Sequence, residues 1–247
     1  MTNQFTRQDL IQLAKLSDRA EKYNEMITYM LLASKFNQDF SDEERKLFTF
    51  AIKKSTQPRR TACTFISNIQ DKKDKEDEQF QKCLQAFKQK IARELIQLCD
   101  DILEAVIHSL NNKILTVESK VYYLKIKGDC YRILAEQDFG NTHASDNAFE
   151  TYSLGYDIAQ QKLCPLNSIR LSLTNNFCVF YYEIMRDPTK ACLTGQKLIN
   201  LALDHAELNG CESCNNFTAT KSALFPLVDN IKYWTFIQQE NYFVEEL

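Results

Sequence analysis

The stretch Glu118–Glu136, with the sequence ESKVYYLKIKGDCYRILAE, carries the most information about this chain. It lies within a segment that we expect to form a helix over residues 117–138. Asp129 and Glu136 stand three and four residues from Arg132. Side chains at these spacings are neighbours on a helix, so both carboxylates can pair with the guanidinium. The stretch therefore predicts a helix that carries an arginine held in a fixed orientation.

Helical periodicity extends over the rest of the chain. From Phe80 to Leu110, apolar side chains recur every three or four residues, which predicts one apolar stripe along a long helix. A tetratricopeptide-type array would show a repeat near 34 residues, and the unequal segments do not fit one. We expect an all-α fold of nine antiparallel helices, over residues 6–19, 22–36, 42–69, 78–111, 117–138, 145–162, 167–186, 188–208 and 216–238.

Two helix starts carry specific signals. Ser41 and Glu44 have the spacing of a capping box, in which the hydroxyl and the carboxylate each accept from an unpaired backbone N–H. Asp187 precedes Pro188, the arrangement of an N-cap followed by proline at the first helical position. These signals predict helices that begin near residues 42 and 188.

The composition excludes several classes of protein. Five glycines and four prolines in 247 residues disfavour turn-rich β-sandwiches and glycine-rich nucleotide folds. A net charge of −3 gives no indication of a nucleic-acid partner. The longest apolar run, near residues 177–182, is too short to span a bilayer, and the N-terminus lacks the apolar core of a signal peptide. We expect a cytoplasmic protein with no membrane or nucleic-acid partner.

Cysteines and histidines do not combine into a convincing site. Nine cysteines are spread over mostly apolar helix positions, which fits a reducing compartment better than a disulfide framework. Cys211 and Cys214 form the only C-x-x-C pair, with His205 upstream and no second pair for zinc. The three histidines lie far apart and match no nucleophile–base pattern. We therefore expect no catalytic residues, no metal site and no cofactor.

Lys53 and Arg60 are the residues of interest in the segment 42–69. They are seven residues apart, so about two helical turns place both cations on one face. A guanidinium matches phosphate oxygens with two parallel N–H groups, and a lysine adds a mobile charge. The pair therefore fits a phosphate site, but it equally fits a solvated basic face. The residues alone favour the solvated face.

Several segments together resemble the 14-3-3 family. The resemblance rests on Glu118–Glu136, on Asn176–Ile184 (NFCVFYYEI), and on matches that extend from Leu10 to Trp234. It implies a single helical domain over residues 1–240 with a short tail over 241–247. It also implies a cup-shaped protomer with an amphipathic groove, paired into a dimer. Members of this family are adaptors, not enzymes, and bind phosphoserine or phosphothreonine segments of client proteins.

The resemblance also assigns the site residues. Lys53, Arg60 and Arg132 correspond to the cations around the phosphate. Asn176 and Asn230 correspond to asparagines whose amides hydrogen-bond the peptide backbone, since an amide offers both donors and an acceptor. The expected groove is completed by further residues on the same segments, namely Lys125, Asp129, Val179, Glu183, Leu227 and Trp234.

The chain departs from the family pattern at four positions. Ile133 replaces a tyrosine whose hydroxyl contacts the phosphate, and Thr64 replaces an arginine. Asn175 replaces a leucine on the apolar wall, and Pro226 falls inside the last helical segment, where a proline costs about 3 kcal/mol or forces a kink. The leading hypothesis is a phosphorylation-dependent adaptor that regulates signalling through phosphorylated clients. The alternative is a scaffold of the same shape that has weakened or lost phosphate dependence and binds unphosphorylated partners.

Residues in the N-terminal half of the chain match the dimer interface of the family. The apolar part comprises Leu16, Ala20, Ile66 and Phe87. The charged part pairs Lys22 with Glu94 and Glu25 with Lys90 across the subunits, each with opposite signs. Such surface pairs contribute about 0–1 kcal/mol each, so the affinity must come from the apolar contact. We expect a dimer, formed with a second copy or with a paralogue.

Overall fold

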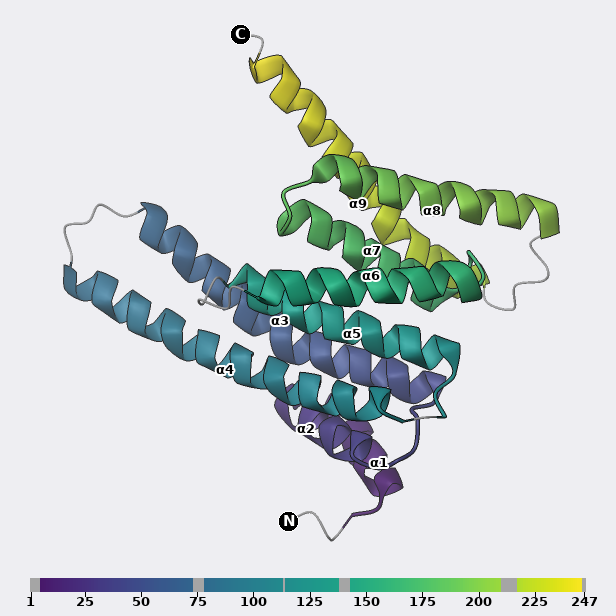
Figure 1. The fold of residues 1–247 in the computed structure, drawn as a ribbon. Helices are drawn as coiled ribbons and strands as arrows, with labels where there is room; N and C mark the ends of the chain where they lie inside the picture. Colours follow the sequence, from purple (N-terminus) through teal and green to yellow (C-terminus); the bar gives the residue numbers. More distant parts are fainter. Residues whose placement is uncertain (1–4, 73–77, 113, 138–142, 210–216, 246–247) are drawn as a thin grey trace. The chain divides into compact units, whose positions relative to one another are not determined.

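The protein is described from a computed structural model over residues 5–72, 78–112, 114–137, 143–209 and 217–245. Within these residues the chain forms nine helices and no strands (Figure 1). They are α1 Arg7–Arg19, α2 Tyr23–Ser34, α3 Asp42–Lys72, α4 Glu78–Leu110, α5 Val117–Glu136, α6 Ala144–Lys162, α7 Ser168–Glu183, α8 Pro188–Asn209 and α9 Phe217–Glu245. The all-α prediction is confirmed, and only the end of α9 lies more than three residues from its expected position.

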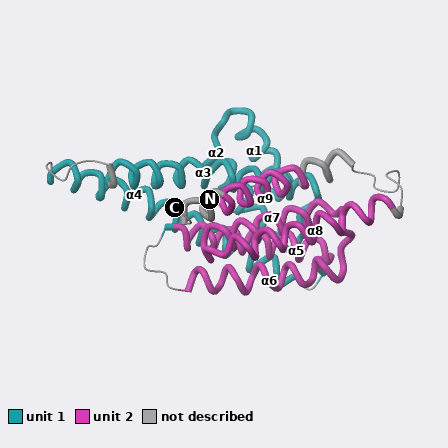
Figure 2. Tube along the Cα trace, turned by 90° about the horizontal axis from the view of Figure 1, so that it is seen from above, with its two compact units in different colours: residues 1–114, 137–139 teal, residues 115–136, 140–247 magenta. Residues whose placement is uncertain are grey.

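The chain separates into two compact units (Figure 2). Unit 1 contains α1 to α4, and unit 2 contains α5 to α9. The single domain expected over residues 1–240 and the cup with its groove depend on how the two units are placed. Both therefore stay predictions.

Two helices of unit 1, α1 and α3, begin with a capping box. Thr6 accepts from the N–H of Asp9, and its own N–H donates to the Asp9 carboxylate at 2.9 Å. The predicted capping box at α3 is confirmed, because the N–H of Ser41 donates to Glu44 at 2.8 Å and the N–H of Glu44 to the Ser41 hydroxyl at 3.4 Å. Arg7 then pairs with Glu44 at 2.8 Å and ties α1 to the start of α3.

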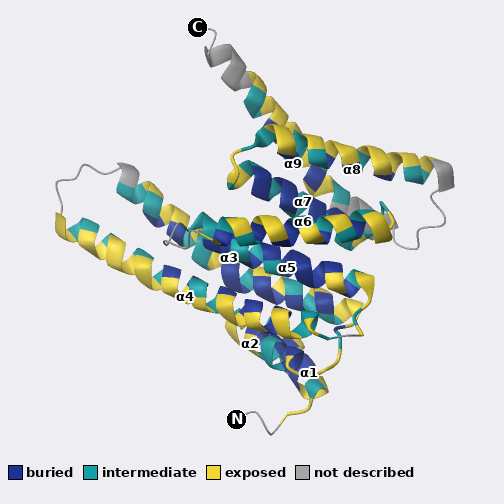
Figure 3. Cartoon of the chain, viewed as in Figure 1, coloured by how far each residue is buried: buried dark blue, intermediate teal, exposed yellow. Residues whose placement is uncertain are grey.

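The apolar faces of α2, α3 and α4 form much of the interior of unit 1, beside the buried residues of α1. Met26, Phe48 and Leu95 are at most 1% exposed and come one from each of these helices. Figure 3 shows the matching pattern along α4, where buried positions recur at helical spacing between exposed ones. The C-terminal half of the expected apolar stripe, with Leu95, Ile102 and Val106, is therefore the face that α4 turns towards the core, whereas Phe87 in its N-terminal half is 55% exposed.

The interior of unit 2 is built around Tyr152 of α6. Its ring is fully buried and stacks on Phe177 of α7 at 5.5 Å between ring centroids. A Cβ atom at Gly128 of α5 would lie 2.7 Å from the Tyr152 ring. Only glycine therefore lets the ring come this close to α5, which brings the tyrosine hydroxyl to Asp129.

The end of α7 and the start of α8 are each explained by nearby residues. Arg186 has φ 54°, a left-handed conformation that L-residues rarely adopt, and it follows α7, which ends at Glu183. Asp187 accepts from the N–H of Lys190 at 2.8 Å, so the predicted N-cap of α8 is confirmed. The helix α9 continues through Pro226, which is exposed.

None of the described helices combines the length and the hydropathy that a membrane crossing requires.

Candidate functional site

Arg132 lies on the buried side of α5, where carboxylates surround its guanidinium. Nη1 donates to Glu136 one turn further along α5 and to Glu183 of α7, the latter at 3.3 Å. The side chain of Arg132 is 10% exposed, whereas that of Glu183 is 46% exposed. The expected pair with Glu136 is thus present. The long contact to the half-exposed Glu183 is the one that an incoming anion can replace.

Arg132 stays positively charged despite its burial. Burial alone lowers the pKa of the guanidinium, but the Tyr152 side chain and the carboxylates of Glu136 and Asp129 raise it above its usual range. A buried cation that remains charged attracts anions more strongly than an exposed one, because little water screens it. The residue therefore fits the phosphate-binding role that the resemblance implies.

Asp129 is the polar centre of unit 2. Its Oδ2 accepts from Lys125 at 2.7 Å, while its Oδ1 accepts from the hydroxyl of Tyr152 at 2.5 Å and from Nδ2 of Asn176 at 2.7 Å. Burial raises the pKa of the carboxyl, but the charges of Lys125 and Arg132 outweigh burial and lower the pKa below its ordinary value. Asp129 acts on Arg132 through its charge, while its ion pair is made with Lys125.

Asn176, Val179 and Glu183 share one face of α7, as their spacing of three and four residues requires. Asn176 and Val179 are half-buried and Glu183 is exposed, so this face is partly open to solvent. Asn230 of α9 reaches the same helix, because its Nδ2 donates to Oδ1 of Asn175 at 3.0 Å. The structure therefore brings these predicted peptide-binding residues together within unit 2.

Leu227 and Trp234 occupy the core of unit 2. Leu227 is fully buried, and Trp234 is 4% exposed and stacks on Tyr182 at 4.9 Å. Both side chains pack α9 against α7 and α8. Their contact with a ligand stays a prediction.

Ile133 is also buried, at 4% exposed, so the departure next to Arg132 belongs to the packed interior.

The basic face of α3 in unit 1 divides into two pairs of cations. Lys54 lies over the rings of Tyr23 and Phe50, at 5.0 Å and 5.3 Å from their centroids. Arg59 donates to the carbonyl of Ser55 at 2.7 Å and pairs with a carboxylate of α4 at 3.5 Å. These two cations are thus engaged within unit 1.

Lys53 and Arg60 are the other two cations of α3. Lys53 is exposed, and Arg60 is half-buried with Nη1 donating to Gln57 at 3.4 Å. The helix is continuous from Asp42 to Lys72 and passes through Pro58, so the two cations share one face as expected. Their convergence with Arg132, which lies in unit 2, stays a prediction.

Several predicted dimer residues are exposed on unit 1. Leu16 is 58% exposed and Phe87 55%. Phe65 of α3, for which the sequence made no interface prediction, is 63% exposed. Ala20, Lys22, Glu25, Lys90 and Glu94 are exposed as well. Ile66 is 4% exposed within the chain itself, so it packs in the core of unit 1 and is not available to a partner.

Glu94 already has a partner within the chain. Its carboxylate lies 3.5 Å from Nε of Arg59, and its side chain is 48% exposed. A cross-subunit pair between Lys22 and Glu94 would therefore compete with this contact. The predicted pair can contribute little to a dimer.

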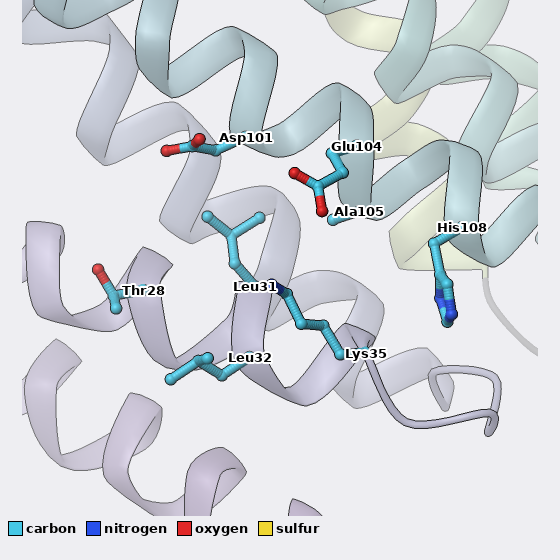
Figure 4. Close-up of a pocket in the computed structure, with 8 residues that line it drawn as sticks. All are labelled: Thr28, Leu31, Leu32, Lys35, Asp101, Glu104, Ala105 and His108. Carbon is cyan, nitrogen blue, oxygen red and sulfur yellow. The ribbon is translucent and has the colours of Figure 1, made fainter. Parts of the chain in front are cut away.

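Unit 1 also contains a pocket of about 350 Å³ between α2 and α4 (Figure 4). Its lining includes Lys35 and His108 beside the carboxylates of Asp101 and Glu104. No predicted site residue lines it.

Among the described residues, no cluster of histidine, cysteine or carboxylate side chains could hold a metal ion. Cys211 and Cys214 lie outside the described residues.

Comparisons with known proteins agree with the resemblance seen in the sequence. The family model described as 14-3-3 protein matches residues 13–235. A 14-3-3 protein homolog of Trichoderma harzianum is 35% identical over 94% of this chain and 89% of its own length. The checkpoint signal transducer rad24 of Schizosaccharomyces pombe is 35% identical over 93% of this chain and 85% of its own. Protein BMH2 of Saccharomyces cerevisiae is 36% identical over the same shares.

Proposed function

Because the chain belongs to the 14-3-3 family, we propose that it is an adaptor that binds client proteins phosphorylated on serine or threonine. The observation that carries the proposal is the setting of Arg132. This buried guanidinium remains charged and is held in place by Glu136. Its second carboxylate contact, to Glu183, is long and open to exchange.

In this proposal the phosphate replaces Glu183 at Arg132. Charge-assisted hydrogen bonds to phosphate contribute about 1.5–3 kcal/mol each, so a second and third cation would account for most of the phosphate dependence. Lys53 and Arg60 supply those cations from α3. Their spacing of seven residues on the continuous helix α3 places both side chains on one face.

The peptide backbone next to the phosphate would be bound by Asn176 and Asn230. Asn176 keeps a second N–H and one lone pair of its amide oxygen on the partly open face of α7. Val179 contributes an apolar contact beside it. Lys125 and Asp129 act as positioning residues, because their ion pair fixes Asn176 and lies beside Arg132.

The biological role follows from the relatives. One of them is named a checkpoint signal transducer, and we propose a corresponding role in signalling for this chain. The partners would be phosphorylated client proteins and a second copy or paralogue, in the cytoplasm. Neither a cofactor nor catalysis forms part of the proposed mechanism.

The alternative, a scaffold without phosphate dependence, rests on Ile133. This side chain is buried and offers no hydroxyl to a phosphate beside Arg132. The loss of one neutral donor leaves the three cations in place, however. The alternative is therefore not favoured.

A paired titration tests the proposal. A degenerate peptide library with a fixed central phosphoserine and an identical library with serine are titrated into the full-length protein. We expect the phosphoserine library to bind at least about tenfold more tightly, since even one charge-assisted hydrogen bond amounts to that ratio. Equal affinities for the two libraries would overturn the proposal and leave the scaffold.

A further inference from the structure

Asn175 stands in the middle of a chain of amide hydrogen bonds in unit 2. Nδ2 of Asn230 donates to Oδ1 of Asn175 at 3.0 Å, and Nδ2 of Asn175 donates to Oδ1 of Asn176 at 3.3 Å. Nδ2 of Asn176 then donates to Oδ1 of Asp129 at 2.7 Å. Each of these side chains donates to the next one on the way to the carboxylate of Asp129. The series of hydrogen bonds therefore connects α9 to α7 and α7 to α5.

The amide of Asn175 uses only half of its hydrogen-bonding capacity in this series. An asparagine amide has two N–H donors and an oxygen that accepts two hydrogen bonds. Asn175 uses one donor and one acceptor position, and its side chain is half-buried. Its other N–H and lone pair therefore depend on water until a ligand covers them.

We propose that Asn175 is a specificity-determining residue, which selects a client side chain that can form hydrogen bonds over an aliphatic one. The inference rests on the proposed function, since it concerns a peptide bound between Asn176 and Asn230. Asn175 hydrogen-bonds to both of these residues, so a peptide that reaches them also covers Asn175.

The selection follows from the cost of covering an amide. A leucine placed over Asn175 removes water from its free N–H and lone pair without replacing either hydrogen bond. A glutamine of similar size restores both. Sites that hydrogen-bond their ligand discriminate strongly against analogues that lack the matching groups, because the buried polar atoms of the site stay unpaired.

Asn175 also fixes the two asparagines on either side of it. Its oxygen determines which end of the Asn230 amide faces α7, and its N–H determines which end of the Asn176 amide faces Asp129. A leucine at position 175 cannot provide either contact. Both neighbouring amides would then lose a partner, while the aliphatic surface beside them would increase.

The test compares matched peptides with matched variants. A set of phosphoserine peptides carries glutamine or leucine at one flanking position at a time, and Kd is measured for wild type, Asn175→Leu and Asn200→Leu. Asn200 lies exposed on α8 and bonds only locally to Gln196, so it is the control for the same chemical change elsewhere.

We expect wild type and Asn200→Leu to prefer glutamine by about five- to thirtyfold at one flanking position. Asn175→Leu should lose or reverse that preference. Asn175→Ala serves as a second variant in case leucine perturbs the fold, and it should lose the preference without reversing it. Circular dichroism and the melting temperature show whether each variant is folded.

Two results would overturn the inference. One is a wild-type preference for leucine, or no preference, at every flanking position. The other is a glutamine preference that Asn175→Leu and Asn175→Ala leave within twofold. Unphosphorylated twins of the same peptides separate this outcome from a failure of the proposed function, in which phosphate itself would add no affinity.

Discussion

The hydroxyl of Tyr152 donates a hydrogen bond to Oδ1 of Asp129 at 2.5 Å, in a part of unit 2 where the tyrosine is fully buried and the Asp129 side chain is 16% exposed. The contact joins α6 to α5 and is possible because Gly128 admits the tyrosine ring. It places a neutral donor beside the charges of Lys125 and Arg132. The proposed phosphate site is thus supported by a residue on a different helix.

Replacing Tyr152 with phenylalanine should destabilise unit 2. The variant keeps the ring packing and removes one hydrogen bond to a charged acceptor, which contributes about 1.5–3 kcal/mol. Denaturant unfolding measures the loss. Tyr233→Phe is the matched control, because Tyr233 is 58% exposed and should change stability by no more than about 0.5 kcal/mol. Equal effects of the two variants would contradict the role of the Tyr152 hydroxyl.

The stability of the protein should fall in acid partly because of Asp129. Its pKa is lower in the folded protein than the ordinary value of about 3.9, so its contribution is present above about pH 4. That contribution is lost as the pH falls towards the folded-state pKa. Asp129→Asn should therefore flatten the decline of stability below pH 4, as measured by unfolding at a series of pH values. The exposed Asp204→Asn should keep the wild-type slope.

The apolar residues exposed on unit 1 should hold the dimer together. Leu16→Glu should shift the protein to a monomer in sedimentation at micromolar concentration, since an unpaired charge is costly to bury. Glu94→Lys should have a small effect, because a surface pair contributes about 0–1 kcal/mol. Leu203→Glu on α8 is the control, as Leu203 is equally exposed but lies in unit 2. A dimer that survives Leu16→Glu would remove α1 from the interface.

Replacing Ile133 with tyrosine should have opposite effects on binding and on stability. The new hydroxyl can donate to a phosphate at Arg132, so phosphopeptide affinity should rise by several-fold up to about tenfold. Ile133 is only 4% exposed, so the larger ring should also cost about 1–3 kcal/mol of stability through overpacking. Peptide titration and denaturant unfolding separate the two effects. An equal gain for the unphosphorylated twin would show that the ring adds only apolar contact.

Much of the fold could be predicted from local signals in the sequence. The capping box at Ser41 and the N-cap at Asp187 are present as expected, because both depend on residues a few positions apart. The end of α9 was placed too early, since no glycine or proline marks its C-terminus. The helix α7 ends at Glu183, before the predicted end at residue 186. A glycine in the left-handed conformation commonly marks the end of a helix, but here that conformation is adopted by Arg186.

The candidate site was predictable only where it depends on one helix. The pairing of Arg132 with Glu136 follows from helical spacing, and the structure confirms it. Tyr152 was missed because it lies 23 residues from Asp129 and meets it only through the packing of α6 on α5. Ile66 and Phe65 show a related limit, since adjacent apolar residues of a helix can lie on its buried or its exposed face.

The central claim of the proposed function is that Arg60 of α3 and Arg132 of α5 bind the same phosphate. Its most direct test is the affinity of a phosphoserine peptide and its serine twin for wild type, Arg60→Ala, Arg132→Ala and the double variant. Arg132→Lys, which keeps the charge, and Arg59→Ala, which removes the neighbouring cation of α3, are the controls.

Each single alanine variant should weaken phosphopeptide binding by roughly ten- to hundredfold and leave the serine twin unchanged. The double variant should bind both peptides with the same affinity, while Arg59→Ala should retain the preference for phosphate. Phosphopeptide affinity that stays unchanged in both single variants, with folding intact by circular dichroism, would contradict the claim.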